Sequence, residues 1–144
     1  DMLGLDTERV TKMIIIHDLS ESIIGDYMPG EIARKRKRIE ERNAMTSILN
    51  QMPVAIRSNY RRIWEEYQAN KTQVAKFVHK LDKLEMAMQA RQYINEGYSS
   101  ETLIQFFGSA RRSIGRYKID QDDPPSGDIV LEILNTLEKS IMKQ

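Results

Sequence analysis

Apolar residues recur at three- and four-residue steps along the first part of the chain, the spacing of helices that bury one face. Asp6 can cap a first helix that begins at Thr7, because its carboxylate can accept hydrogen bonds from the free amides of a helix start. One face of this helix combines apolar side chains with polar ones of chemical interest: Val10, Met13, Ile14, His17, Asp18 and Glu21. The turn residues Gly25 and Pro29 then predict a loop across residues 25–30.

Two further helices are predicted before residue 70. The first runs from Glu31 to Met52, with a charged outer face and a buried stripe made of Ile32, Ile39, Met45, Ile48 and Leu49. Pro53 suits the first turn of the next helix, because proline there loses no helical hydrogen bond. This second helix extends to about Gln68, and its inner side carries Ile56, Tyr60, Ile63, Trp64 and Tyr67. The helical spacing of these aromatic residues favours core packing over base stacking.

The longest periodic segment, residues 71–95, predicts a central buried helix. Its apolar face consists of Val74, Phe77, Val78, Leu81, Leu84, Met88 and Tyr93. Two acidic residues, Asp82 and Glu85, lie within that face, and Gly97 closes the helix.

Two shorter helices complete the pattern. One begins after Ser99 or Ser100 and ends near Gly108, and the other is amphipathic and spans residues 129–142. Between them, residues 118–128 are acidic and contain adjacent prolines, which indicates a solvated surface loop. No strand pattern or repeat competes with this interpretation. We therefore expect an all-α fold, with residues 1–144 forming a single compact domain of about six helices.

The composition is that of an ordinary folded protein. The 144 residues are 40% hydrophobic and 30% charged, and 22 basic against 21 acidic residues leave a net charge of +1. Nucleic acid and membrane partners are therefore not expected, because no overall field attracts the chain to them. No signal-peptide pattern and no long apolar run is found, so we expect a cytoplasmic protein. With no cysteine, metal ligands must come from His, Asp and Glu.

The pair His17-Asp18 adjoins an apolar run, where burying both groups is costly unless they bind an ion or hydrogen-bond. Taken alone, such a pair is more often structural or exposed. Its surroundings change this interpretation, because Glu21 follows one helical turn later and Asp26 follows at the next turn of the chain. A simple surface acid remains an alternative for Glu21, and a turn residue remains one for Asp26.

Four stretches carry a recognisable combination of residues: HDLSESIIGD from residue 17, RKRIEERNAM from residue 36, WEEY from residue 64 and FVHKLDKLEM from residue 77. With them, the first two-thirds of the chain resembles the HD-domain superfamily of metal-dependent phosphohydrolases, and within it the 5'-deoxynucleotidase branch. The resemblance implies that His17, Asp18 and Asp82 ligate a metal ion. In the family a further histidine from a preceding helix joins them. None precedes His17, so we expect a domain that is incomplete at its N-terminus.

The resemblance also implies a reaction. A divalent ion with nitrogen and oxygen ligands, which suit Mn, Co, Fe or Zn better than Mg, would activate water for attack on a phosphate ester. Glu21 would orient that water or relay its proton, and Asp26 would hold a substrate sugar or the outer shell of the ion. The expected substrate is a nucleotide, most simply a deoxynucleoside 5'-monophosphate. The resemblance also implies a homodimer, because relatives of this type are often dimers.

Alternatives stay open at this point. The substrate can be another nucleotide or phosphate ester, because fold and metal residues do not separate these. A non-catalytic helical binding or regulatory module is the rival class, with the basic run Arg34–Arg38 as its docking surface. That run is followed by acids, which favours a solvated face. His79 is left out of the metal set, because the family pattern requires no ligand there.

Overall fold

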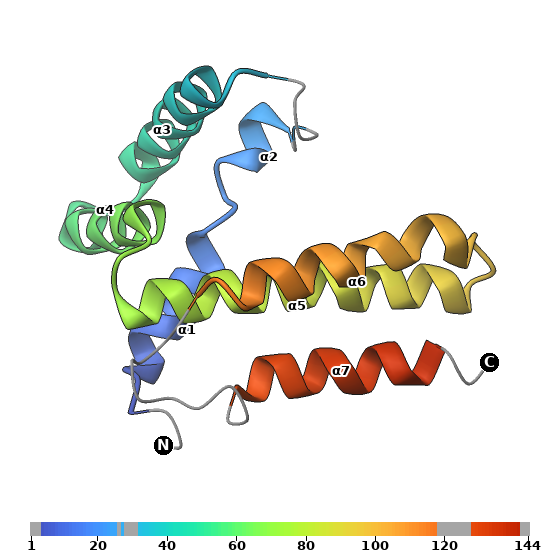
Figure 1. Cartoon of the computed structure of the whole chain (residues 1–144). Helices are drawn as coiled ribbons and strands as arrows, with labels where there is room; N and C mark the ends of the chain where they lie inside the picture. Colours follow the sequence, from blue (N-terminus) through green and yellow to red (C-terminus); the bar gives the residue numbers. More distant parts are fainter. Residues whose placement is uncertain (1–3, 26, 28–31, 118–127, 142–144) are drawn as a thin grey trace. The chain divides into compact units, whose positions relative to one another are not determined.

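The computed structural model describes residues 4–25, 27, 32–117 and 128–141, and within them every regular element is an α-helix (Figure 1). This confirms the predicted all-α fold. The chain divides into two compact units, Asp1–Ala69 and Asn70–Gln144. The described helices of the first unit are α1 (Thr7–Ile16), α2 (Glu21–Ile24), α3 (Arg34–Gln51) and α4 (Val54–Ala69). Those of the second unit are α5 (Gln73–Asn95), α6 (Ser100–Ile114) and α7 (Ile129–Ile141).

In the first unit, α4 contacts both α1 and α3, and α3 also contacts α2. Asp6 caps α1 as predicted, since its side chain accepts a hydrogen bond from the amide of Arg9 at 3.0 Å. The Arg9 side chain in turn donates to Glu66 of α4 at 2.6 Å. The face of α1 that is buried consists of Val10, Met13 and Ile16. Apolar burial and a charged hydrogen bond therefore both join α1 to α4.

The prediction of one continuous helix through Glu21 is wrong. Helix α1 ends at Ile16, and residues 17–20 form a turn before α2 begins. The break has a local cause, because His17 Nδ1 lies 2.7 Å from the carbonyl oxygen of Ile14, an acceptor that a continuing helix would use. Tighter turns replace the helical bonds, as the Glu21 amide donates to the Asp18 carbonyl at 2.9 Å. Ser20, only 2% exposed, anchors this turn.

The predicted core residues of α3 and α4 are confirmed in part. Met45, Leu49, Ile63, Trp64 and Tyr67 are all buried. The two predicted core residues that lie elsewhere are Ile39 and Ile56, which are 53% and 42% exposed. The inner face of α3 runs back from Leu49 and Met45 in steps of four residues, and these steps lead to charged side chains at positions 41 and 37. Ile39 therefore lies off that face.

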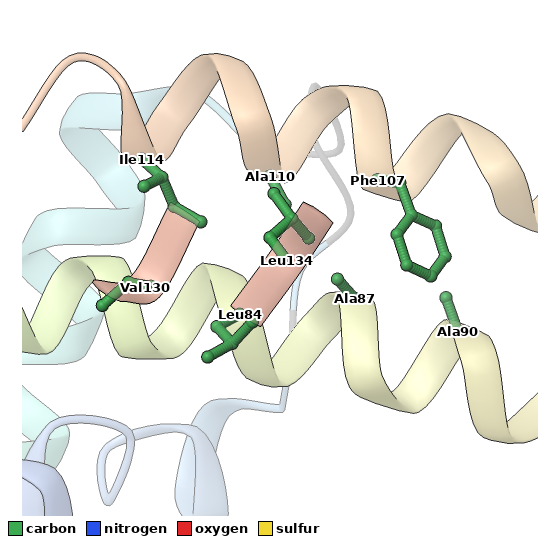
Figure 2. Close-up of a cluster of buried hydrophobic side chains, with 8 residues drawn as sticks. All are labelled: Leu84, Ala87, Ala90, Phe107, Ala110, Ile114, Val130 and Leu134. Atoms are coloured by element: carbon green, nitrogen blue, oxygen red, sulfur yellow. The ribbon is translucent and has the colours of Figure 1, made fainter. Parts of the chain in front are cut away.

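The second unit is a three-helix arrangement in which α5, α6 and α7 contact one another. Its core, drawn in Figure 2, consists of Leu84, Ala87, Ala90, Phe107, Ala110, Ile114, Val130 and Leu134. The Phe107 ring points from α6 toward Ala90 of α5, and it is completely buried. Alanines on the facing helix leave the room that the ring fills. Burying such a side chain stabilises the fold by about 1.5–3 kcal/mol.

The boundaries of α5 and α6 test two sequence signals. Gly97 ends the central helix as predicted, with a backbone φ of +95° that favours glycine. Gly108 does not end α6, which continues to Ile114. A glycine inside a helix costs about 1 kcal/mol relative to alanine. Burial of Ala110 and Ile114 beyond it outweighs that cost.

On α5, the predicted core positions Met88 and Tyr93 are wrong, as they are 52% and 39% exposed. Glu85 is exposed as well, whereas the Asp82 side chain is 24% exposed. The buried face is instead formed largely by small residues, including Ala75, Ala87 and Ala90. Such residues permit close helix contacts but carry little weight in a pattern of large apolar side chains.

A buried ion pair joins α5 to the start of α7. Lys80 is 2% exposed, and its Nζ lies 2.5 Å from Oδ2 of Asp128, whose side chain is 14% exposed. The other carboxylate oxygen of Asp128 accepts from the amide of Leu131 at 3.4 Å. The predicted acidic loop spans residues 118–128, and Asp128 is the one residue of it that the structure describes.

The described helices include none with the length and apolar character of a membrane span.

Candidate metal centre

His17 and Asp18 lie at the end of α1, where the chain turns toward α2. The His17 amide still donates to the carbonyl of Met13 at 3.0 Å, so the helix fixes the start of the turn. The imidazole Nε2 lies 2.8 Å from Oδ2 of Asp18. The histidine side chain is 17% exposed and the aspartate side chain 54%, so the pair opens to one side. This turn is the structural setting of the predicted HD pair.

The two ring nitrogens of His17 have different roles. Nδ1 faces the carbonyl oxygen of Ile14 at 2.7 Å, and because a carbonyl only accepts, Nδ1 must carry a proton. In the neutral ring Nε2 then presents a lone pair to the carboxylate of Asp18. Two lone pairs at 2.8 Å repel each other unless a proton on Nε2 or a shared cation separates them. A histidine that donates through one nitrogen and offers the other to a metal is the usual metal-binding arrangement. The geometry therefore fits either a protonated imidazole or a bound cation, and it offers one nitrogen and one oxygen ligand.

Tyr67 of α4 fixes the plane of the imidazole. Its ring centroid lies 5.3 Å from that of His17, with the rings at 72° in an edge-to-face contact. Tyr67 itself is only 7% exposed, so its ring is held by the core of the first unit. The sequence predicted this residue as core, which is correct, but it did not indicate the contact with His17.

Glu21 is the first residue of α2. Its amide is bonded to Asp18, and its carbonyl accepts from the Gly25 amide at 2.8 Å. The Glu21 side chain is 29% exposed, and its Oε1 lies 3.8 Å from Nζ of Lys37 on α3. The predicted catalytic carboxylate is therefore carried by the element that follows the HD turn directly.

Glu41 is a further carboxylate near this turn that the sequence did not single out. Burial raises the pKa of Glu41, while the positive charges of Lys37 and Arg38 lower it and the negative charge of Asp18 raises it. The influence of Asp18 indicates that the two carboxylates act on each other electrostatically. A usable signal existed, because Glu41 lies four residues before the buried Met45 and thus on its face of α3.

The third predicted metal ligand comes from a different helix. Asp82 is in the second unit, on α5, where its Oδ2 lies 2.9 Å from Nζ of Lys83. His79, three residues earlier, stacks on Tyr117 with ring centroids 5.4 Å apart and planes at 16°. Asp26 lies outside the described residues, so its predicted role stays a prediction.

The chain is helical throughout its described elements and offers nitrogen and oxygen donors at the HD turn, and sequence comparison identifies the family. The profile of the HD domain family matches residues 1–119, so this chain belongs to the HD domain family. Membership implies binding of a divalent metal ion. The resemblance found in the sequence is confirmed.

Similar proteins are named 5'-deoxynucleotidases. Human 5'-deoxynucleotidase HDDC2 is 31% identical over 118 residues, which cover 81% of this chain and 58% of the human protein. The mouse protein of the same name is 36% identical over 90 residues, or 62% of this chain and 45% of its own. The Schizosaccharomyces pombe 5'-deoxynucleotidase hdd1 is 36% identical over 108 residues, covering 72% and 54%. The chain thus spans about half the length of these relatives.

Proposed function

We propose that this protein is a metal-dependent phosphohydrolase that converts deoxynucleoside 5'-monophosphates to nucleoside and phosphate. The observation that carries the proposal is the His17–Asp18 pair, whose Nε2 and Oδ2 lie 2.8 Å apart while the other ring nitrogen is engaged by a backbone carbonyl. This arrangement supports a cation site in an HD-family chain. The relatives' names supply the substrate class.

His17, Asp18 and Asp82 are the proposed protein ligands of the ion. His17 and Asp18 are supported by their geometry, and Asp82 by its position within the family stretch FVHKLDKLEM. When bound, a divalent ion polarises a phosphoryl oxygen and lowers the pKa of a water molecule. One nitrogen and two carboxylate donors suit Mn, Co, Fe or Zn, and suit Mg less well.

Glu21 is the proposed group that handles the proton of the attacking water. Its position at the start of α2, directly after the HD turn, supports this role, and its carboxylate can accept a proton at Oε1 or Oε2. Asp26 is proposed to contact the substrate sugar, on the resemblance alone. A homodimer and a cytoplasmic location likewise stay predictions.

The experiment combines elemental analysis with phosphate release from a panel of ribo- and deoxynucleoside monophosphates. Asp82→Ala is compared with Glu85→Ala, a matched control that removes an exposed carboxylate one turn further along the same helix. We expect about one transition metal per chain, and deoxynucleotide hydrolysis that Asp82→Ala abolishes and Glu85→Ala leaves intact. Metal-loaded protein that hydrolyses no nucleotide would contradict the proposal.

A further inference from the structure

The inner face of α3 changes character along its length. Leu49 and Met45 are each 1% exposed, and the same face continues toward the start of the helix through Glu41 and Lys37, with side chains 15% and 29% exposed. Lys37 Nζ lies 3.8 Å from Oε1 of Glu41 on its own helix. The same Nζ lies 3.8 Å from Oε1 of Glu21 on α2. One ammonium group therefore stands between two carboxylates from different helices.

A second pair on α3 provides a contrast at identical spacing. Arg36 Nε lies 2.8 Å from Oε1 of Glu40, again four residues apart, but the Arg36 side chain is 75% exposed. Such an exposed pair contributes little, because water and salt screen it. The Lys37 contacts lie on the side of α3 that continues into the core, where charges interact more strongly. The two pairs therefore differ in surroundings rather than in sequence pattern.

Helix α2 depends on contacts with its surroundings. It has four residues and no buried side chain, and a single helical turn is not stable by itself. Its first residue, Glu21, also follows the Asp18 carboxylate by only three positions, and Glu41 adds a further negative charge nearby. Carboxylates that lie close together repel one another. A positive charge between Glu21 and Glu41 opposes that repulsion.

We propose that Lys37 is a positioning residue, anchored by Glu41, that holds the Glu21 carboxylate beside the His17–Asp18 turn. The catalytic consequence rests on the proposed function, since it takes Glu21 as the proton acceptor. Lys37 is not proposed to touch the substrate. Its loss should therefore lower kcat and leave KM nearly unchanged, because an ill-placed base slows proton transfer without weakening binding.

The first test is a double-mutant cycle on the metal-free protein. Urea midpoints are measured for Lys37→Gln, Glu21→Gln and the double variant, and for the matched set in which Arg36→Gln replaces Lys37→Gln. We expect the Lys37 and Glu21 substitutions to be non-additive, and the Arg36 and Glu21 substitutions to be additive. Additive midpoints in the Lys37 cycle would overturn the inference whether or not the protein is active.

The second test is steady-state hydrolysis of deoxynucleoside monophosphates by the metal-loaded variants. Lys37→Gln should lower kcat about tenfold, a part of the roughly 10²–10⁴-fold that a general base contributes, with KM within about twofold. Lys37→Arg, which keeps the charge, should recover most of kcat, and Arg36→Gln should match wild type. Unchanged kcat in Lys37→Gln would overturn the inference. An inactive wild type would instead overturn the proposed function, and the cycle alone would then decide whether Lys37 holds Glu21.

Discussion

The two units treat charged side chains on their inner faces differently. In the second unit, Lys80 is 2% exposed and meets the Asp128 carboxylate at 2.5 Å. In the first unit, Lys37 is 29% exposed and stands 3.8 Å from each of two carboxylates. A tight, dry pair suits a structural tie, whereas a partly exposed charge between two carboxylates can hold one of them in place while leaving it open to solvent. Burial and distance thus distinguish the two lysines, in line with the different role proposed for Lys37.

The largest expected effect on stability comes from breaking the Lys80–Asp128 ion pair of the second unit. Asp128→Asn leaves the buried Lys80 ammonium without its counter-charge but keeps a side-chain oxygen to cap α7. We expect the free energy of unfolding to fall by about 3 kcal/mol, measured by urea denaturation. Lys139→Met, at an exposed position on α7, is the control and should change it by less than about 0.5 kcal/mol. Equal losses in the two variants would mean that the pair does not stabilise this unit.

A smaller effect is expected where the first unit orients its histidine. Tyr67→Leu removes the ring edge that contacts the His17 imidazole, and Tyr67→Phe keeps it. Metal affinity, measured by calorimetric titration with Mn²⁺, should weaken about tenfold in the leucine variant, because groups that orient a ligand commonly contribute that much. The phenylalanine variant should stay close to wild type. If both variants bind alike, the ring does not orient the ligand.

The smallest expected effect concerns Met88, at the edge of the second unit's core. Met88 fits the apolar pattern of α5 yet is 52% exposed. Met88→Gln, which keeps a good helix former, should change the free energy of unfolding by less than about 0.5 kcal/mol in urea. A loss of about 2 kcal/mol or more would indicate that this position is covered in the protein in solution.

Periodicity predicted most of the helices, because buried stripes recur every three to four residues wherever a helix packs. It missed the end of α1 at Ile16, because the apolar residues keep helical spacing across the turn that follows. The contact of the His17 side chain with the Ile14 carbonyl, which interrupts the helix, is not visible in that spacing. Periodicity also favours large side chains, and it therefore predicts Met88 in a core that Ala87 and Ala90 form.

For the candidate site, the sequence supplied the residues and the structure supplied their surroundings. His17, Asp18 and Glu21 were found from one short motif, because the motif is local in the chain. Tyr67 and Glu41 come from distant helices, and their contacts depend on tertiary packing that no spacing rule encodes. Glu41 lies within a run of charged residues, and only its position four residues before the buried Met45 distinguishes it from them.

The short length of α2 has a consequence for the conditions in which the protein works. An element with four residues and no fully buried side chain is not stable by itself, so its order depends on its neighbours, among them the HD turn and the charged side chain of Lys37 on α3. Attraction between partly exposed charges is screened over about 10 Å at 0.1 M salt. Rising ionic strength therefore weakens the attraction between Lys37 and Glu21 more than it weakens the buried ion pair of the second unit. We expect salt to loosen α2 at concentrations at which the other helices stay folded.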